Sequence, residues 1–289
     1  MRCHHKGWRR LTTVSAYAVL AAWSVVCVFP VYWLAVTSLK GADDIIRPGR
    51  YLPFLDFVPT LDSWRFILTD PTDNLVARFL ASLWVGTMAT LLAIAAATFA
   101  AYGLTRFVSR IPANGIMLGI LGSRILPPVA VVLPVYLMAQ WAGAIDTMTV
   151  LVAVYAAVNL PVALWLVHPV LGPRVTEQEE AARIDGASHL RILVSIVLPM
   201  AAGGVAAAAV LVFVLCWNEY LIAAYLTTRH ALTLPPWMAG QMSAREAQIG
   251  GEPEEWAHLS AAALLMILPP FLLTGWVRRA LLRRTPGRP

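Results

Sequence analysis

Charged residues are scarce in this sequence. Asp, Glu, Lys and Arg make up 13% of its 289 residues, whereas hydrophobic residues make up 59%. Soluble domains average about 25% charged residues. A run of ~20 apolar residues is needed to cross the ~30 Å hydrocarbon core of a bilayer, and several runs here reach that length. The composition therefore excludes an ordinary soluble globular protein and predicts an all-α, polytopic membrane protein.

The sequence also lacks the patterns of most catalytic and metal sites. Its three cysteines are scattered and form neither a disulfide framework nor a metal-binding spacing; they are Cys3, Cys27 and Cys216. Its six histidines have no ligand spacing either, and no zinc-protease motif, nucleophile elbow or carboxylate pair stands out. No G-x-x-x-x-G-K-[ST] loop is present, so the chain has no phosphate-cradling loop for ATP. We therefore expect no catalytic residue, no metal and no cofactor in this chain.

Six apolar segments alternate with polar ones. The expected spans are 13–37, 79–104, 113–138, 148–170, 200–226 and 256–277. The first span follows a basic segment, but its length and the spans after it favour a retained helix over a signal peptide. We divide the chain into an N-terminal segment 1–12, a first span 13–37, a loop 38–78, a core 79–280 and a basic tail 281–289.

The charges of the polar segments indicate the topology. The N-terminal segment, the 105–112 loop and the C-terminal tail are basic and nearly free of acidic residues, whereas the 38–78, 141–147 and 227–256 loops are neutral to acidic. Basic loops remain in the cytoplasm. Both termini are therefore expected in the cytoplasm. The net charge of +6 reflects this arrangement, and we expect no nucleic-acid partner.

One polar stretch, 176–199, interrupts the apolar spans on the cytoplasmic side. Thr176 can cap a short helix, and Glu179, three residues later, would complete a capping box. Gly186 suits the left-handed position that ends such a helix. Ser188 can cap a second helix, which passes into the next span near Pro199. The local prediction is a helix, a sharp turn and a second helix at the membrane surface.

This stretch resembles the cytoplasmic EAA loop of ABC importer permeases. The family pattern is E-A-A, three residues, G, nine residues, I, one residue, L-P, and it matches Glu180, Ala181, Ala182, Gly186, Ile196, Leu198 and Pro199. Asp185, Gly186 and Ala187 form the D-G-A of the carbohydrate branch. Further likenesses lie in the A-Y-G ending at Gly103, the N-L-P at 159–161 and the W-N-E-Y at 217–220. The chain thus resembles the second permease of maltose-type importers.

The resemblance implies a fold, partners, a role and a location in the inner (plasma) membrane of a bacterial cell. The fold would be the six-span type I importer permease, paired with a second, homologous permease. Two ATP-binding subunits would bind ATP and dock on the EAA loop, and a solute-binding protein would contact the 38–78 and 227–256 loops. The residues implied in ATPase coupling are Glu180, Ala181, Ala182, Asp185, Gly186 and Ala187. The alternative for this loop is an ordinary capped helix at the interface.

The solute implied by the resemblance is a di- or oligosaccharide. Glycerol-3-phosphate or a polyol is the alternative, because Arg124 would favour an anion. A remote alternative is a membrane enzyme or scaffold that has kept the permease architecture, although no catalytic constellation supports it.

Arg124 is unusual because it lies near the middle of the third expected span. A charge at that depth costs at least ~2.5 kcal/mol on insertion scales, so it should face protein or water. One interpretation places Arg124 on the translocation path. The other is structural, with Arg124 paired to Asp146 or Glu219 or extended to the membrane surface.

Four other polar or aromatic residues are candidates for the path. Asn159 either lines it or satisfies the backbone carbonyl that Pro161 leaves free. Trp217, Asn218 and Glu219 lie in the fifth expected span, where tryptophan suits sugar C–H surfaces and the polar groups suit hydroxyls. Helix packing is an equal alternative for these three residues.

Overall fold

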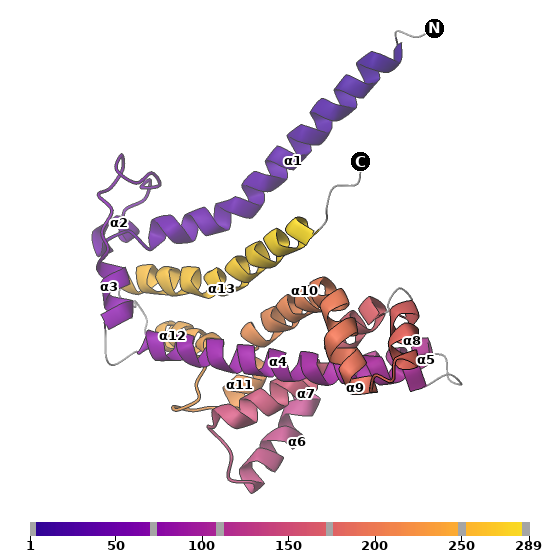
Figure 1. The fold of residues 1–289 in the computed structure, drawn as a ribbon. Helices are drawn as coiled ribbons and strands as arrows, with labels where there is room; N and C mark the ends of the chain where they lie inside the picture. Colours follow the sequence, from indigo (N-terminus) through magenta and orange to yellow (C-terminus); the bar gives the residue numbers. More distant parts are fainter. Residues whose placement is uncertain (1–3, 70–73, 108–112, 172–175, 248–252, 285–289) are drawn as a thin grey trace. The chain divides into compact units, whose positions relative to one another are not determined.

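The fold is built almost entirely from helices (Figure 1). The computed structural model describes the chain except residues 1–3, 70–73, 108–112, 172–175, 248–252 and 285–289. In this described part, the one departure from helix and loop is an isolated bridge between Pro53 and Phe57. Five described helices are long and apolar enough to cross a bilayer, and a bent pair adds a sixth if it counts as one span. The expected all-α, polytopic fold class is confirmed.

The chain divides into two compact units, the first of which comprises Met1–Leu75 and Ala244–Ile267. Its helices are α1 (His4–Thr37), α2 (Ala42–Ile46), α3 (Asp62–Thr69) and the first part of α13 (Glu254–Arg284). Within this unit, the ring of Phe66 on α3 stacks on that of His258 on α13, with centroids 4.2 Å apart. An aromatic contact therefore joins two segments that lie far apart in the sequence.

In the segment after α1, the ammonium group of Lys40 is surrounded by three aromatic rings. The Nζ atom of Lys40 lies over the rings of Trp33, Tyr51 and Phe57, at 5.4, 5.9 and 5.7 Å from their centroids. Burial lowers the pKa of Lys40, and the charge of Asp56 opposes this shift. Cation–π contacts contribute roughly 0.5 to 2 kcal/mol each. This loop is therefore ordered around a charge rather than an apolar core.

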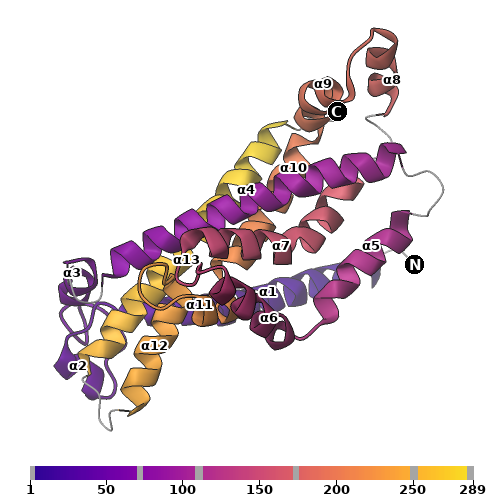
Figure 2. The ribbon, with the colours of Figure 1, turned by 90° about the horizontal axis from the view of Figure 1, so that it is seen from below.

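The second unit comprises Val76–Ser243 and Leu268–Pro289. Its long helices are α4 (Leu75–Phe107), α7 (Met148–Val167) and α10 (Leu198–Trp217), with the last part of α13. The shorter helices are α5 (Ala113–Gly122), α6 (Pro128–Trp141), α8 (Thr176–Ile184), α9 (His189–Ile192), α11 (Leu221–Leu226) and α12 (Leu234–Ala247). Figures 1 and 2 show α4, α7 and α10 side by side.

Small side chains allow these helices to pack closely. Ala89, Ala93, Ala97 and Ala101 lie one turn apart on α4, and all are at most 1% exposed. Small residues favour close helix approach inside a membrane, where the hydrophobic effect does not drive helix association. The remaining faces carry large exposed apolar residues, as expected of helices that also contact lipid. The core of this unit therefore lies between α4, α7 and α10.

The third expected span, 113–138, is broken in the structure. The 3₁₀ turn η1 (Ser123–Ile125) separates α5 from α6, and the two parts of the span are bent by 88°. The cause is Pro127 and Pro128, because a residue that precedes proline is pushed out of the helical region. Leu126 and Pro127 accordingly have extended ψ angles of 131° and 130°. A continuous helix through this segment is therefore not what the structure contains.

Asp146 joins two loops of the second unit. Four successive backbone N–H groups, from Thr228 to Ala231, donate hydrogen bonds to its carboxylate at 3.0 to 3.3 Å. The hydroxyl of Thr228 adds a fifth bond at 2.9 Å. Burial acts to raise the pKa of Asp146, but the backbone donors outweigh it and hold the pKa well below its usual range. The carboxylate therefore fixes the α6–α7 turn against the α11–α12 loop.

We predict that Asp146→Asn destabilises the protein by about 1 to 3 kcal/mol, because one amide oxygen cannot replace two charged acceptors. A depressed pKa contributes stability that is complete above the unfolded pKa of ~4 and is lost as the pH falls through the folded pKa. The difference in unfolding temperature between the two proteins in detergent should therefore stay constant from about pH 8 to about pH 5 and shrink in stronger acid. A difference that already disappears near neutral pH would contradict this account.

Gly204 of α10 marks the closest approach of this helix to η2 (His168–Leu171). A Cβ atom on Gly204 would lie 2.4 Å from Cγ1 and 3.2 Å from Cβ of Val170. Real side-chain atoms do not approach this closely, and Val170 is a stiff, β-branched residue. Position 204 therefore requires glycine for packing.

Gly204→Ala should consequently lower the stability of the protein in detergent by about 1 to 3 kcal/mol, as overpacking does. The matched control is Gly119→Ala on α5, because nothing lies within 4 Å of a Cβ atom built there. The unfolding temperature of the control should be unchanged or slightly higher. Equal unfolding temperatures for the two variants would show that α10 and η2 do not pack as described.

Candidate functional site

The polar stretch that the sequence singles out forms two helices joined by a tight turn. Gly186 has a φ of +81°, so the expected left-handed position is confirmed. The N–H of Ala187 donates to the carbonyl of Ala182, and the N–H of Gly186 donates to that of Arg183, both at 3.0 Å. These two bonds define a Schellman motif, which ends α8. The turn therefore has a geometry that glycine adopts most easily.

The second helix begins as expected and then merges with the next span. The Oγ atom of Ser188 accepts a hydrogen bond from the N–H of Arg191, which confirms Ser188 as the N-cap of α9. A π-helical segment, Leu193–Val197, connects α9 to α10. Pro199 lies in the first turn of α10, directly after the π-helical segment. Motion of the turn is thereby linked to a membrane helix through continuous helical backbone.

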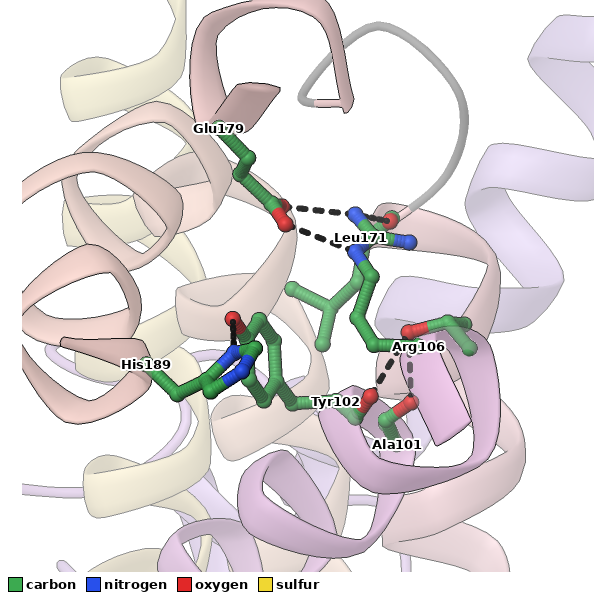
Figure 3. A network of polar contacts seen from close by, with 7 residues as sticks. Ala101, Tyr102, Arg106, Leu171, Glu179 and His189 are labelled. Atoms are coloured by element: carbon green, nitrogen blue, oxygen red, sulfur yellow. Dashed lines mark hydrogen bonds and ion pairs between the residues drawn. The ribbon is translucent and has the colours of Figure 1, made fainter. Parts of the chain in front are cut away.

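A buried ion pair attaches α8 to the end of α4 (Figure 3). The Nε atom of Arg106 donates to one oxygen of Glu179 at 2.7 Å, and an amino group donates to the other at 2.6 Å. The same amino group reaches the carbonyl of Leu171 at 3.4 Å. Glu179 is 1% exposed. This two-pronged geometry is the strongest form of a charge-assisted hydrogen bond.

The role expected of Glu179 therefore needs correction. Its carboxylate was expected in a capping box with Thr176, but both oxygens accept from Arg106. The side chain of Thr176 lies outside the described residues, so the cap expected from Thr176 stays a prediction. A tertiary partner took precedence over the local one because a buried carboxylate needs an opposite charge.

Sequence reasoning missed this pairing, because Arg106 and Glu179 are 73 residues apart. The one available signal was an isolated Arg at the cytoplasmic end of one span and an acidic residue in a loop on the same side. Such a signal does not specify which acidic residue of the loop is the partner.

A second contact lies beside the ion pair. The hydroxyl of Tyr102 is 3.4 Å from Nδ1 of His189, the first residue of α9. The ring of Phe107 packs edge-on against the same imidazole, with centroids 5.0 Å apart. Figure 3 shows that Tyr102 and Arg106 extend from α4 toward α9 and α8, respectively. Both helices of the loop are therefore attached to α4.

The opposite side of the loop is exposed. Glu180, Ala181, Asp185 and Ile184 face outward, and Ile184 is 87% exposed. Ala182 and Ala187 are half-buried and pack against the core of the second unit. Ile184 lies between Arg183 and Asp185 in the sequence, and both of these charged residues are exposed as well. The loop therefore has one attached face and one free face.

Arg124 lies in the η1 turn and is exposed. One of its amino groups donates to Oδ1 of Asn159 at 2.6 Å. The two carboxylates that the sequence analysis considers as partners are engaged elsewhere. Asp146 accepts from the 228–231 amides, and Glu219 accepts from the N–H of Ile222. In the described part of the chain, Arg124 has no ion pair.

Asn159 is buried, at 3% exposure. Its amide nitrogen donates to the carbonyl of Tyr155 at 2.9 Å and to Sγ of Cys216 at 3.3 Å. Pro161 leaves free the carbonyl four residues before it, that of Ala157, so the expectation that Asn159 satisfies this carbonyl is wrong. The amide instead holds Arg124.

The three candidates near the end of α10 have different environments. Trp217 is 1% exposed, and its ring packs against Phe79 and Phe213, so it is a core residue. Asn218 is exposed and donates to the carbonyl of Val214. Glu219 is half-buried, and its carboxylate caps α11. Helix packing and capping therefore account for Trp217 and Glu219. Among the described residues, no cluster of three His, Cys, Asp or Glu side chains has metal-binding geometry.

Comparisons with known proteins agree with this architecture. The profile of a family described as "Binding-protein-dependent transport system inner membrane component" matches residues 89–286. A probable ABC transporter permease protein of Sinorhizobium fredii is 33% identical, over 90% of this chain and 88% of its own. The trehalose/maltose transport system permease protein of Thermococcus litoralis is 29% identical, over 87% of this chain and 86% of its own.

A solved structure has the same fold. One chain of a bacterial ABC transporter involved in the import of the acidic polysaccharide alginate superposes with a TM-score of 0.73, covering 93% of this chain and 96% of that one. The two sequences are 17% identical, so this likeness concerns the fold alone. It confirms the importer permease fold.

We predict that the effects of Arg106 and Glu179 on the free energy of unfolding are not additive. Arg106→Leu should destabilise the protein by about 3 to 5 kcal/mol, because it leaves the Glu179 carboxylate buried and uncompensated. The double variant Arg106→Leu/Glu179→Leu should recover most of this loss in detergent unfolding measurements.

Arg183→Leu is the control for the change in charge, because Arg183 is exposed on the same helix. It should change stability by less than about 0.5 kcal/mol. Additive effects in the double variant would mean that the two residues do not interact.

Proposed function

This chain belongs to the binding-protein-dependent inner-membrane permease family of sugar ABC importers, and from that membership we propose that it forms, with a homologous permease, the path for a sugar that a solute-binding protein delivers. Its relatives are named as transport permeases, so it is a transporter subunit rather than an enzyme. The chain has no nucleotide-binding loop, so ATP is bound and hydrolysed by separate subunits.

The observation that carries this proposal is the two-faced loop of α8 and α9. Glu180, Ala181 and Asp185 lie on its free face, which fits the groove of an ATPase subunit. Its other face is attached to α4 through Arg106, and its second helix continues into α10. Movement of a docked ATPase subunit would therefore pass to two membrane helices without a flexible joint.

The topology and partners follow from the same assignment. Both termini and the α8–α9 loop lie in the cytoplasm, which the distribution of basic residues supports. Two ATP-binding subunits dock there, and the binding protein contacts the 38–78 and 227–256 segments on the other side. Lys40 and Asp146 give these two segments their ordered structure.

The solute is a di- or oligosaccharide, as the name of the Thermococcus litoralis relative suggests. A second candidate is glycerol-3-phosphate or a polyol in the same machinery. The observation that favours an anionic solute is the exposed guanidinium of Arg124, which has no acidic partner in the described part of the chain.

The assembly is tested by purifying the tagged chain in mild detergent and identifying its companions by mass spectrometry. A second six-span permease and a P-loop ATPase should co-purify. A folded chain that is recovered alone, or with unrelated proteins, would contradict the proposed function.

We predict that Gly186→Val reduces ATP-driven uptake by about tenfold or more while the protein stays in the membrane. Nothing lies within 4 Å of a Cβ atom at this position, so the effect comes from the φ of +81° and not from a clash. A left-handed conformation costs other residues roughly 1 to 2 kcal/mol, which is about tenfold in an equilibrium constant.

Gly186→Asn is the matched control, because asparagine tolerates the left-handed conformation. It should retain most of the uptake. Normal uptake by the valine variant, at equal amounts in the membrane, would rule out a coupling role for the turn.

A further inference from the structure

We propose that Arg124 determines the specificity of this permease and binds an acidic group on the transported sugar. The solute would then be a saccharide with a carboxylate, sulfonate or phosphate group. This inference rests on the proposed importer function and narrows its substrate class.

The backbone break shows what surrounds Arg124. Non-helical backbone at membrane depth is tolerated only where protein covers it or where it lines a water-filled cavity. Ile125 and Leu126, beside Arg124, are 85% and 58% exposed. The described residues of the second unit therefore leave the break uncovered. Either a companion subunit or the solute path lies against it.

The charge of Arg124 favours the solute path, rather than a companion subunit, as the neighbour of the break. A guanidinium within a membrane span needs a counter-charge or water. Its membrane-embedded neighbour, Asn159, is neutral, and the nearby Glu219 caps α11. No carboxylate among the described residues forms an ion pair with Arg124. The described residues therefore supply no counter-charge to Arg124, and a solute that carries an oxyanion would supply one.

Asn159 holds the guanidinium of Arg124 in a position where it can bind an oxyanion. Asn159 receives one N–H of the guanidinium and is itself fixed by bonds to Tyr155 and Cys216. Because the asparagine is buried, its oxygen does not move away when a solute arrives. Arginine has five N–H donors in a planar fork that matches the two oxygens of a carboxylate or phosphate. The described contacts use one of these donors, which leaves the others available.

The test uses the complete importer in proteoliposomes, with ATP on the ATPase side and the solute-binding protein on the other. The probes are trehalose, trehalose 6-phosphate, glycerol 3-phosphate and a disaccharide of glucuronic acid. We expect import of an acidic probe, and the probe that is imported identifies the acidic group. Arg124→Gln should reduce this import by about ten- to hundredfold, as the loss of a charged hydrogen bond does. Arg124→Lys should retain part of it.

Asn159→Asp is the decisive second variant. It keeps the shape of the support but provides Arg124 with a counter-ion inside the chain. It should therefore reduce import of the acidic probe as Arg124→Gln does, while the amount of assembled importer in the membrane stays the same.

Other outcomes overturn the proposal. Import of trehalose alone, or import of acidic probes that Arg124→Gln leaves unchanged, would show that Arg124 does not read the solute. A loss of assembled importer in Arg124→Gln, with import per assembled importer unchanged, would place Arg124 at the interface with the companion permease. ATP-driven import of no probe at all would count against the proposed function itself, and the acidic assignment would fall with it.

Discussion

The buried ion pair between Arg106 and Glu179 is the interaction on which the organisation of the cytoplasmic loop depends. Two hydrogen bonds join α8, whose free face is the proposed docking surface, to the end of α4. Because the pair is buried, separating the two residues would leave each charge without a partner, which costs free energy. The loop and the helix therefore move together, which is the property that a mechanical coupling element requires.

The same physical constraint shapes the rest of the chain. Polar groups that leave water must find partners, and the structure provides one of three kinds. Glu179 has an opposite charge, Asp146 has a row of backbone N–H groups, and Lys40 has aromatic rings. Arg124 is the exception to this pattern, because its described partner is a neutral amide and the described contacts use one of its five donors. The exception lies where the backbone is also broken, and the two features together favour a functional interpretation.

Local chemistry was predictable from the sequence, whereas tertiary pairing was not. The turn at Gly186 and the cap at Ser188 depend on neighbouring residues, and both were expected. The fold class followed from the lengths of the apolar runs. Glu179 pairs with Arg106 on α4, and Asn159 contacts Arg124 and Cys216 on other elements, so the local partner that the sequence suggested for each was wrong. The break at Pro127 and Pro128 was not predicted, because the apolar run 113–138 continues through both prolines.

The central claim is that the free face of α8 contacts an ATPase subunit, and site-specific photo-crosslinking in active membranes tests it most directly. A photoreactive amino acid replaces Ala181, which is exposed on that face, and a control replaces Trp141, which is 93% exposed at the end of α6. The account predicts an adduct with a P-loop ATPase from position 181 and none from position 141. Active transport without an ATPase adduct at position 181 would contradict it.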